Sequence, residues 1–284
     1  MIALLLVALA LGPADAVRDT TFQVREGDRL VLEGFRGELE VTGWDGEEMR
    51  VEARGRDEDL IFRLDRRGNA LSLNVLDPKG RDRDAELRIR LPSWMELEVR
   101  GRGFDADVRG LDGSVVLNTL DGDLTLHGLS GPVRATSSDG EIDARELSGS
   151  VELSTGDGEV TLRDCSGSLT VFSVDGEVTM TDMRALNIEA RSTEGDLSFS
   201  GELLSGGDYA FHTHNGEIWI GLDPPVNLSA TVLAYDGEFE AGFPIRTQGF
   251  ESGKSIEFTV GDGSARLVLE AFNGDITLVP RGRN

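Results

Sequence analysis

Residues 119–180 read TLDGDLTLHGLSGPVRATSSDGEIDARELSGSVELSTGDGEVTLRDCSGSLTVFSVDGEVTM, and this stretch decides the fold. An aspartate–glycine turn followed by an acidic residue recurs in it every 18 residues, beginning at Asp121, Asp139, Asp157 and Asp175. A second glycine-containing turn recurs at the same interval between these copies. Each unit is therefore a turn, a short strand, a second turn and a second short strand. A fixed period of about 20 residues predicts a repeat fold in which each unit packs on its neighbours.

Apolar and polar residues alternate inside each unit, which indicates strands with one buried face, because strand side chains alternate between two faces. Two inward columns follow the acidic turn, one starting at Leu124 and the other at Leu126. Small hydroxyl residues stand just before the turn, where we expect them to bond to its backbone: Thr119, Ser137, Thr155, Ser173, Ser192 and Thr213. The pattern predicts an all-β chain, a single-stranded, β-helix-like β-solenoid. Its two-strand rungs have about 18 residues and lie about 4.8 Å apart.

The part of the chain before the repeats divides into two predicted segments. Residues 1–16 are expected to be a signal peptide, because the apolar run Ile2–Leu11 is too short to span a bilayer and small residues follow it. Residues 17–100 contain alternating strands with irregular spacing and are expected to form opening rungs with long or antiparallel excursions. Residues 101–284 are predicted to be the β-solenoid repeat region. We expect no transmembrane segment in the mature chain.

Composition excludes several classes of protein. The chain has 28 Lys and Arg against 52 Asp and Glu, a net charge of −24, which argues against a nucleic-acid partner. A single cysteine excludes an intramolecular disulfide framework and a cysteine zinc site. We expect Cys165, which occupies a turn column otherwise made of leucines, to be a buried apolar residue rather than a reactive thiol.

Several stretches together resemble one bacterial family. They are an opening F-x-V-x-x-G-x-x-L at Phe22–Leu30, an R-G-E-L-E-V stretch, tandem S/T-x-D-G-E-V/I-x-L units and a closing N-G-D-I-T-L at Asn273–Leu278. In these features the chain is similar to the putative-adhesin family, a domain-of-unknown-function group of exported envelope proteins. The resemblance covers nearly the whole mature chain and implies a β-solenoid fold. It brings no catalytic residues with it.

The acidic turns are the first candidate site. Stacked rungs would place Asp121, Asp139, Asp157 and Asp175 in one ladder. Solvated turn residues explain such a ladder, since two unit charges about 4.8 Å apart repel by only about 0.9 kcal/mol in water. The alternative is Ca²⁺ bridging adjacent rungs through carboxylate oxygens. We expect no other cofactor.

Outward aromatic and histidine side chains are the second candidate site. Trp219 stands in a column otherwise made of small polar and acidic residues, and an indole there is not required by the repeat. His214 and Tyr235 are expected to share the column before the turn, one rung apart. His212 and His214 point to the same face and are a possible metal pair, with Asp208 or Glu217 as a third ligand. The alternative for the aromatic residues is burial under the 242–262 loop.

The predicted function is a non-enzymatic, exported cell-envelope protein, an adhesin or binding scaffold that presents strand faces to a glycan or protein partner. A Ca²⁺-stabilised structural scaffold is the first alternative. A polysaccharide-degrading β-helix enzyme is the second, although no nucleophile elbow, phosphate loop or zinc-protease motif occurs. The predicted location is periplasmic, cell-surface or secreted.

Overall fold

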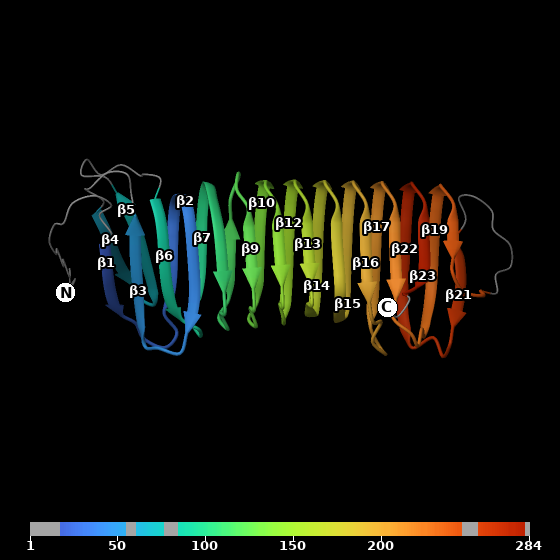
Figure 1. The fold of residues 1–284 in the computed structure, drawn as a ribbon, viewed down its shortest axis with the longest axis horizontal. Helices are drawn as coiled ribbons and strands as arrows, with labels where there is room; N and C mark the ends of the chain where they lie inside the picture. Colours follow the sequence, from blue (N-terminus) through green and yellow to red (C-terminus); the bar gives the residue numbers. More distant parts are fainter. Residues whose placement is uncertain (1–17, 55–60, 77–84, 246–254, 282–284) are drawn as a thin grey trace.

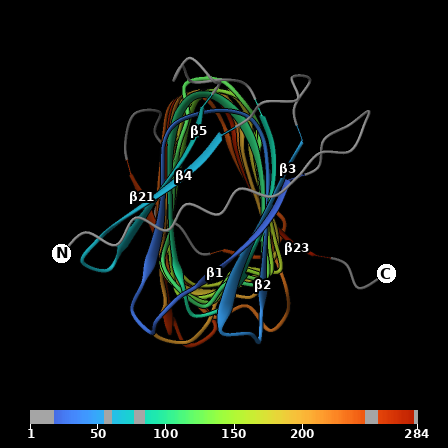
Figure 2. The ribbon, with the colours of Figure 1, turned by 90° about the vertical axis from the view of Figure 1, so that its left-hand side faces the viewer.

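The computed structural model describes residues 18–54, 61–76, 85–245 and 255–281. The predicted signal peptide lies outside these ranges. Within them the chain is all-β, with strands lying side by side along one long axis (Figure 1). The described strands form one mixed sheet, which the end view shows wrapped into a flattened ring (Figure 2).

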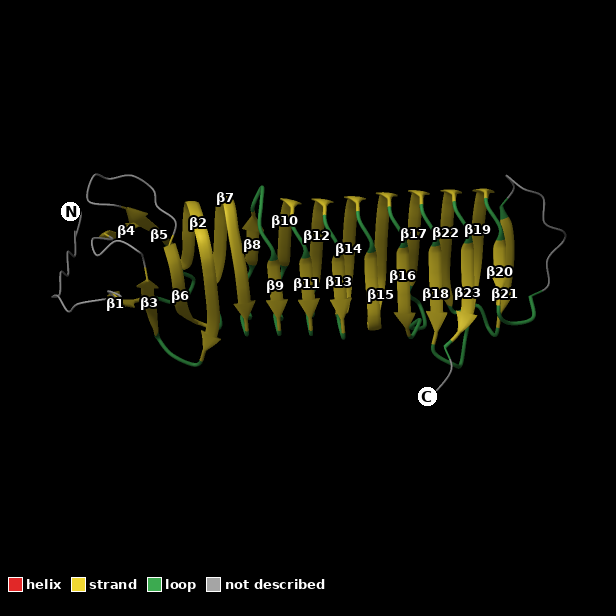
Figure 3. Cartoon of the chain, turned by 45° about the horizontal axis from the view of Figure 1, so that its top comes forward, coloured by secondary structure: helices red, strands yellow, loops and turns green. Residues whose placement is uncertain are grey.

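The ring has two broad sides, which we call the first row and the second row (Figure 3). The first row runs, in spatial order, through β4 (Ile61–Arg67), β5 (Ala70–Leu76), β2 (Arg29–Trp44), β7 (Glu96–Arg109), β8 (Val115–Asn118), β10 (Val133–Asp139), β12 (Ser150–Asp157), β14 (Ser166–Asp175), β15 (Val178–Glu194), β17 (Asp208–Asn215), β22 (Ala265–Asn273), β19 (Leu228–Asp236) and β21 (Ile256–Val260). The second row runs through β1 (Arg18–Gln23), β3 (Glu48–Arg54), β6 (Ala85–Pro92), β2, β7, β9 (Leu124–His127), β11 (Ile142–Arg145), β13 (Val160–Arg163), β15, β16 (Leu197–Gly201), β18 (Ile218–Leu222), β23 (Ile276–Pro280) and β20 (Phe239–Ala241). We call one strand segment of each row, with the turn between them, a rung.

The 18-residue period of the sequence reappears as the strand register. Val133 pairs with Val115 on one side and Val151 on the other, and Ile142 pairs with Leu124 and Val160, all in parallel strands. The predicted inward columns are buried between the two rows and form one continuous core, except at their ends in β20, where Phe239 and Ala241 are partly exposed. Apolar side chains of equivalent positions therefore stack on one another along the axis, which removes them from water.

Glycine follows the aspartate of each acidic turn because a side chain there would collide with the neighbouring rung. Gly158 has φ +153°, and a Cβ on it would lie 2.2 Å from the carbonyl oxygen of Gly140. Gly140 and Gly176 are placed in the same way against their own neighbours. The second turn has room at its positive-φ position, where Gly128 is replaced by Glu146, Asp164 and Asp182 in the next rungs.

The hydroxyl column behaves as predicted at four of its six positions. The hydroxyls of Thr119, Ser137, Thr155 and Thr213 donate hydrogen bonds to turn carbonyls at 2.7–3.1 Å. Those of Ser173 and Ser192 are buried with no hydrogen-bond partner among the described residues. The column continues as Ala271 in β22 and Ala234 in β19.

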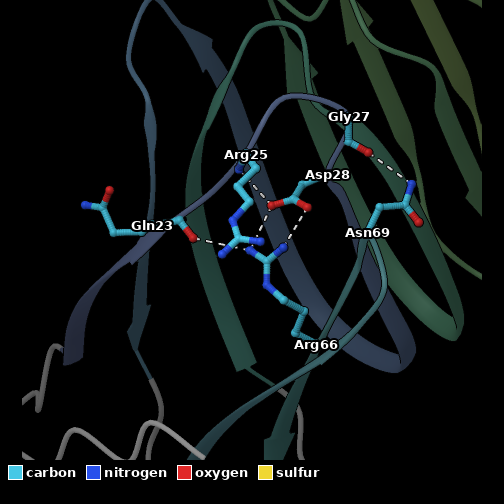
Figure 4. A network of polar contacts seen from close by, with 6 residues as sticks. All are labelled: Gln23, Arg25, Gly27, Asp28, Arg66 and Asn69. Atoms are coloured by element: carbon cyan, nitrogen blue, oxygen red, sulfur yellow. Dashed lines mark hydrogen bonds and ion pairs between the residues drawn. The ribbon is translucent and has the colours of Figure 1, made fainter. Parts of the chain in front are cut away.

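The N-terminal strands combine parallel and antiparallel pairing. β2 pairs in parallel with β5, β6 and β7, whereas β1–β3, β3–β6 and β4–β5 are antiparallel. The β4–β5 hairpin is attached through Asp28, which is 3% exposed (Figure 4). Its carboxylate accepts hydrogen bonds from both terminal nitrogens of Arg66, at 2.7 and 2.8 Å, and from the Arg25 amide. Such a bidentate, charge-assisted contact fixes the hairpin on the turn before β2.

The late rungs do not follow chain order, which corrects the prediction that His214 and Tyr235 lie one rung apart. β22 and β23 lie between β17 and β18 on one side and β19 and β20 on the other. Asn273 consequently pairs with both Asn215 and Asp236. β19 and β20 therefore do not pair with β17 and β18, which precede them in the chain. After β21 the chain returns, and β22 and β23 lie between the two pairs of strands.

Candidate functional site

An aromatic stack stands on the first row just before the acidic turn. The inserted strand β22 places Phe272 between His214 of β17 and Tyr235 of β19, with ring centroids 4.8 Å apart on both sides and planes 19° and 8° apart. Phe272 is 44% exposed and Tyr235 is 52% exposed. We call these three side chains the aromatic stack. Earlier rungs carry Ser138, Gly156, Val174 and Thr193 in the same column.

Phe272 was missed by the sequence reasoning, because repeat units were assumed to stack in chain order. One signal could have placed it correctly. Asn215 and Asn273 are the turn positions with asparagine in place of an acidic residue, and they lie in adjacent rungs. The Asn273 side-chain nitrogen donates a 2.7 Å hydrogen bond to the side-chain oxygen of Asn215.

Trp219 lies in β18 and therefore on the second row, whereas the aromatic stack lies on the first row. It is 40% exposed. Its indole lies over Gly221, two residues along the same strand: a Cβ on Gly221 would be 2.4 Å from the indole ring. The absence of a side chain at Gly221 therefore provides the space that the indole occupies. The structure does not unite Trp219 with His212, His214 and Tyr235 in one site.

The predicted cover of these aromatic residues falls partly outside the described residues, since 246–254 are not among them. The described beginning of that segment, with Phe243 and Ile245, packs against the core. Among the described residues, Trp219, Phe272 and Tyr235 all retain at least two-fifths of their exposure.

An open groove of about 470 Å³ crosses β14, β15, β17 and β22 on the first row beside the aromatic stack. Its floor is the column Thr170, Glu189, Ala210 and Val268, in which Ala210 leaves the shortest side chain. One wall contains Ser168, Asn187, Asp208 and Arg266, and the other contains Arg191, His212 and Glu270. We call this feature the Ala210 groove. Of the predicted candidates it includes His212 and, on the opposite wall, Asp208.

Opposite charges pair within the Ala210 groove. Nη2 of Arg191 lies 2.6 Å from the Glu189 carboxylate, and Arg266 lies 3.3 Å from Asp208. Nδ1 of His212 lies 2.9 Å from Glu270. Each carboxylate of the groove therefore has a basic neighbour within it, and hydrogen-bond donors and acceptors line both walls.

No third ligand joins the predicted histidine pair among the described residues, and metal binding by the pair stays a prediction. His212 contacts Glu270 rather than Asp208 or Glu217. Across the described ranges, no group of three or more His, Cys, Asp or Glu side chains is arranged to hold a metal ion.

The acidic turns form the predicted ladder in register. Asp121 pairs with Asp139, Asp139 with Asp157 and Asp157 with Asp175, and all four are exposed. A neighbouring column explains part of the acidic composition, because its aspartates accept backbone amide hydrogen bonds from the next rung. The carboxylate of Asp123 accepts one from Glu141, that of Asp196 from Glu217 and that of Asp275 from Glu238. Calcium binding to the ladder stays a prediction.

Cys165 is fully buried, in line with its predicted role as an apolar turn residue. Burial raises the pKa of its thiol above the ordinary value. The thiolate is the reactive form, so this environment disfavours reactivity.

Buried Tyr209 connects two neighbouring segments of the chain. Its hydroxyl donates a hydrogen bond to the Ala185 carbonyl and accepts one from the Leu204 amide, both at 2.7 Å.

Comparison with known proteins adds distant structural neighbours. No family model and no curated protein matches the chain. Among solved structures it is similar to one described as a putative adhesin from Bacteroides fragilis, with 14% identity, TM-score 0.48, and coverage of 94% of this chain and 99% of that one. A putative lipid binding protein from Parabacteroides distasonis has 15% identity and TM-score 0.41, covering 92% and 96%. A putative cell adhesion protein from Clostridium sporogenes has 12% identity and TM-score 0.28, covering 94% and 100%.

In the described ranges, no helix has the length and apolar character needed to cross a membrane.

Proposed function

We propose that this chain is an exported, non-enzymatic binding protein of the adhesin type. We infer that it is a β-solenoid whose late rungs present recognition faces to a component of the cell envelope. The observation that carries the proposal is the set of exposed aromatic side chains on these rungs, at positions where the repeat does not require them.

The residues at equivalent positions of the other rungs support this proposal. In the column of Trp219, the other rungs carry Thr125, Asp143, Thr161, Thr179, Ser198, Thr277 and Glu240. Stacking between aromatic neighbours accounts for about 0.5–1.5 kcal/mol per pair and explains why the rings lie together. It does not account for their exposed surface, which is the kind of surface that binding proteins use as anchors.

The charge arrangement supports a binding role over a catalytic one. Acid–base catalysis requires a titratable group held ready to exchange a proton with a substrate. The three carboxylates of the Ala210 groove instead lie beside Arg191, Arg266 and His212.

Export rests on the apolar run Ile2–Leu11 and the small residues after it. Periplasmic, cell-surface and secreted locations all fit that signal. Fractionation of cells that express the full chain, with N-terminal sequencing of the product, tests it: a mature N-terminus at Val17 is expected, and an intact Met1 in the cytoplasmic fraction would contradict export.

Binding is tested by co-sedimentation of the mature chain, residues 17–284, with purified cell-envelope fractions. We expect saturable binding that weakens at least tenfold in Trp219→Ala or in Phe272→Ala. Thr125→Ala is the matched control, because it truncates the same column as Trp219 in an early rung. The absence of saturable binding by the unaltered protein would contradict the proposal. Equal binding by all variants would remove both aromatic faces from it.

A calcium-stabilised scaffold is the second candidate, and the in-register ladder from Asp121 to Asp175 is the observation that favours it. Bridging ions would bind the folded state alone and would raise its melting temperature by mass action. Thermal melts with Ca²⁺, with chelator and with Na⁺ at matched ionic strength test this. A melting temperature that Ca²⁺ raises no more than matched Na⁺ would eliminate the candidate.

A further inference from the structure

The Ala210 groove lies along the axis of the fold rather than along a strand. Its floor and walls come from equivalent positions on four successive strands of the first row, β14, β15, β17 and β22. Three strand spacings of about 4.8 Å make it about 14 Å long between the outermost strands. A ligand that fills it is therefore elongated and crosses the strands.

The polar walls suit a ligand with many hydroxyl groups. Arg191 and Arg266 supply N–H donors, while Asp208 and Glu270 supply acceptors, and Asn187 supplies both. The floor contributes the methyl groups of Thr170, Ala210 and Val268, with the Glu189 carboxylate, paired to Arg191, between Thr170 and Ala210. A sugar ring presents hydroxyls at its rim and C–H groups on its faces, so the walls and floor match its two kinds of surface.

The aromatic stack extends one wall. His214 and Phe272 lie two residues beyond His212 and Glu270 on the same strands and on the same face. Exposed aromatic rings beside a polar groove provide apolar contact for the C–H face of a sugar.

Two other elongated ligands fit less well. A peptide that adds to a sheet needs an edge strand with unpaired backbone groups, whereas β15, β17 and β22 are paired on both sides. A polyanion meets a protein of net charge −24 and a groove whose two arginines are already matched by Glu189 and Asp208.

We propose that the Ala210 groove binds a neutral, linear glycan lying along the axis of the fold. This inference rests on the proposed binding function and names the ligand class of one face. Ala210 and Val268 contact the C–H faces of the sugar rings, the ion-paired walls bind the hydroxyls, and Phe272 packs at the rim.

The test is calorimetric titration of the mature chain with hexasaccharides of β-1,4-glucan, β-1,3-glucan, β-1,4-mannan and α-1,4-glucan, beside an oligogalacturonate of equal length. Ala210→Tyr fills the groove at an outward-facing strand position, where an aromatic residue is well tolerated. Thr136→Tyr is the matched control, since it puts the same side chain on the outward face of β10, outside the groove. Arg266→Gln removes one wall charge with little change in volume.

We expect at least one neutral hexasaccharide to bind, with a loss of at least tenfold in Ala210→Tyr, a loss of about threefold or more in Arg266→Gln and no change in Thr136→Tyr. Tighter binding of the oligogalacturonate, no binding of any neutral hexasaccharide, or equal binding by the unaltered protein and both groove variants would each overturn the proposal. Envelope sedimentation distinguishes a failure of the groove assignment from a failure of the proposed binding function. If the unaltered protein sediments with envelope fractions and neutral hexasaccharides do not compete, the groove assignment fails while the binding function stands.

Discussion

We call the rungs between β8 and the start of β15 the early rungs, and those from β17 to β23 the late rungs. Both sets have the same cross-section, but they differ in register, strand order and surface residues. In the early rungs the register repeats every 18 residues, and the exposed large apolar side chains are Leu120, Phe172 and Val174, none of which stacks on another aromatic ring of the described residues. In the late rungs the spacing is loose, the order along the axis departs from chain order, and aromatic residues reach the surface. The aromatic stack and Trp219 therefore both lie where the spacing of the repeat is loose.

Gly158→Ala is expected to have the largest effect on this comparison, because it tests whether the early rungs are fixed by their turns. The added methyl would meet the Gly140 carbonyl oxygen at 2.2 Å and strain a backbone with φ +153°. Backbone strain and overpacking together should lower the free energy of unfolding by roughly 2–6 kcal/mol, measured by urea denaturation.

Gly128→Asp is the control for that prediction, since Asp164 and Asp182 occupy the equivalent positive-φ position in later rungs. Its free energy of unfolding should stay within about 1 kcal/mol of the unaltered protein. Equal losses in the two variants would show that the contact with the neighbouring rung is not what selects glycine in the acidic turn.

Tyr209→Phe is expected to have an intermediate effect and tests the anchoring of the late rungs. The substitution removes the hydroxyl that bridges the Ala185 carbonyl and the Leu204 amide. Loss of the hydroxyl from the buried Ala185 carbonyl and the partly buried Leu204 amide should lower the free energy of unfolding by about 1–3 kcal/mol, measured by urea denaturation. A change below about 0.5 kcal/mol would mean that β17 is positioned by its apolar contacts alone.

Ser137→Ala and Ser173→Ala are expected to have the smallest effects, and they compare two positions of the hydroxyl column within the early rungs. Ser137 donates to the Gly122 carbonyl, so its loss should cost about 1 kcal/mol. Ser173 is buried without a described partner, so alanine there, as at Ala271 in β22, should be neutral or stabilising. The opposite ranking in thermal melts would show that the Ser173 hydroxyl has a partner in solution.

The sequence was sufficient for the early rungs because their geometry is local. Once Asp121 and Asp139 are aligned, the inward columns, the hydroxyl column and the buried Cys165 follow from strand alternation alone. The same argument explains why the acidic ladder could be predicted residue by residue.

The late rungs could not be ordered in this way, because their neighbours are set by an excursion of the chain. His212 contacts Glu270, a residue 58 positions away, because β22 lies beside β17, and β19 lies on the far side of β22. The Ala210 groove could not be predicted from the sequence for the same reason. About half of its lining residues come from β17 and β22, and no fixed period predicts that these strands are neighbours.

The inserted rung also has a consequence for the order in which the fold can form. From β7 to β18 the rungs can be added one after another as the chain emerges, each on a neighbour that precedes it in the chain. β19 has no parallel neighbour until β22 arrives, and β22 bonds on both sides at once. The last part of the fold should therefore form in a single cooperative step that waits for residues 265–280, whereas the early part can grow and fray one rung at a time.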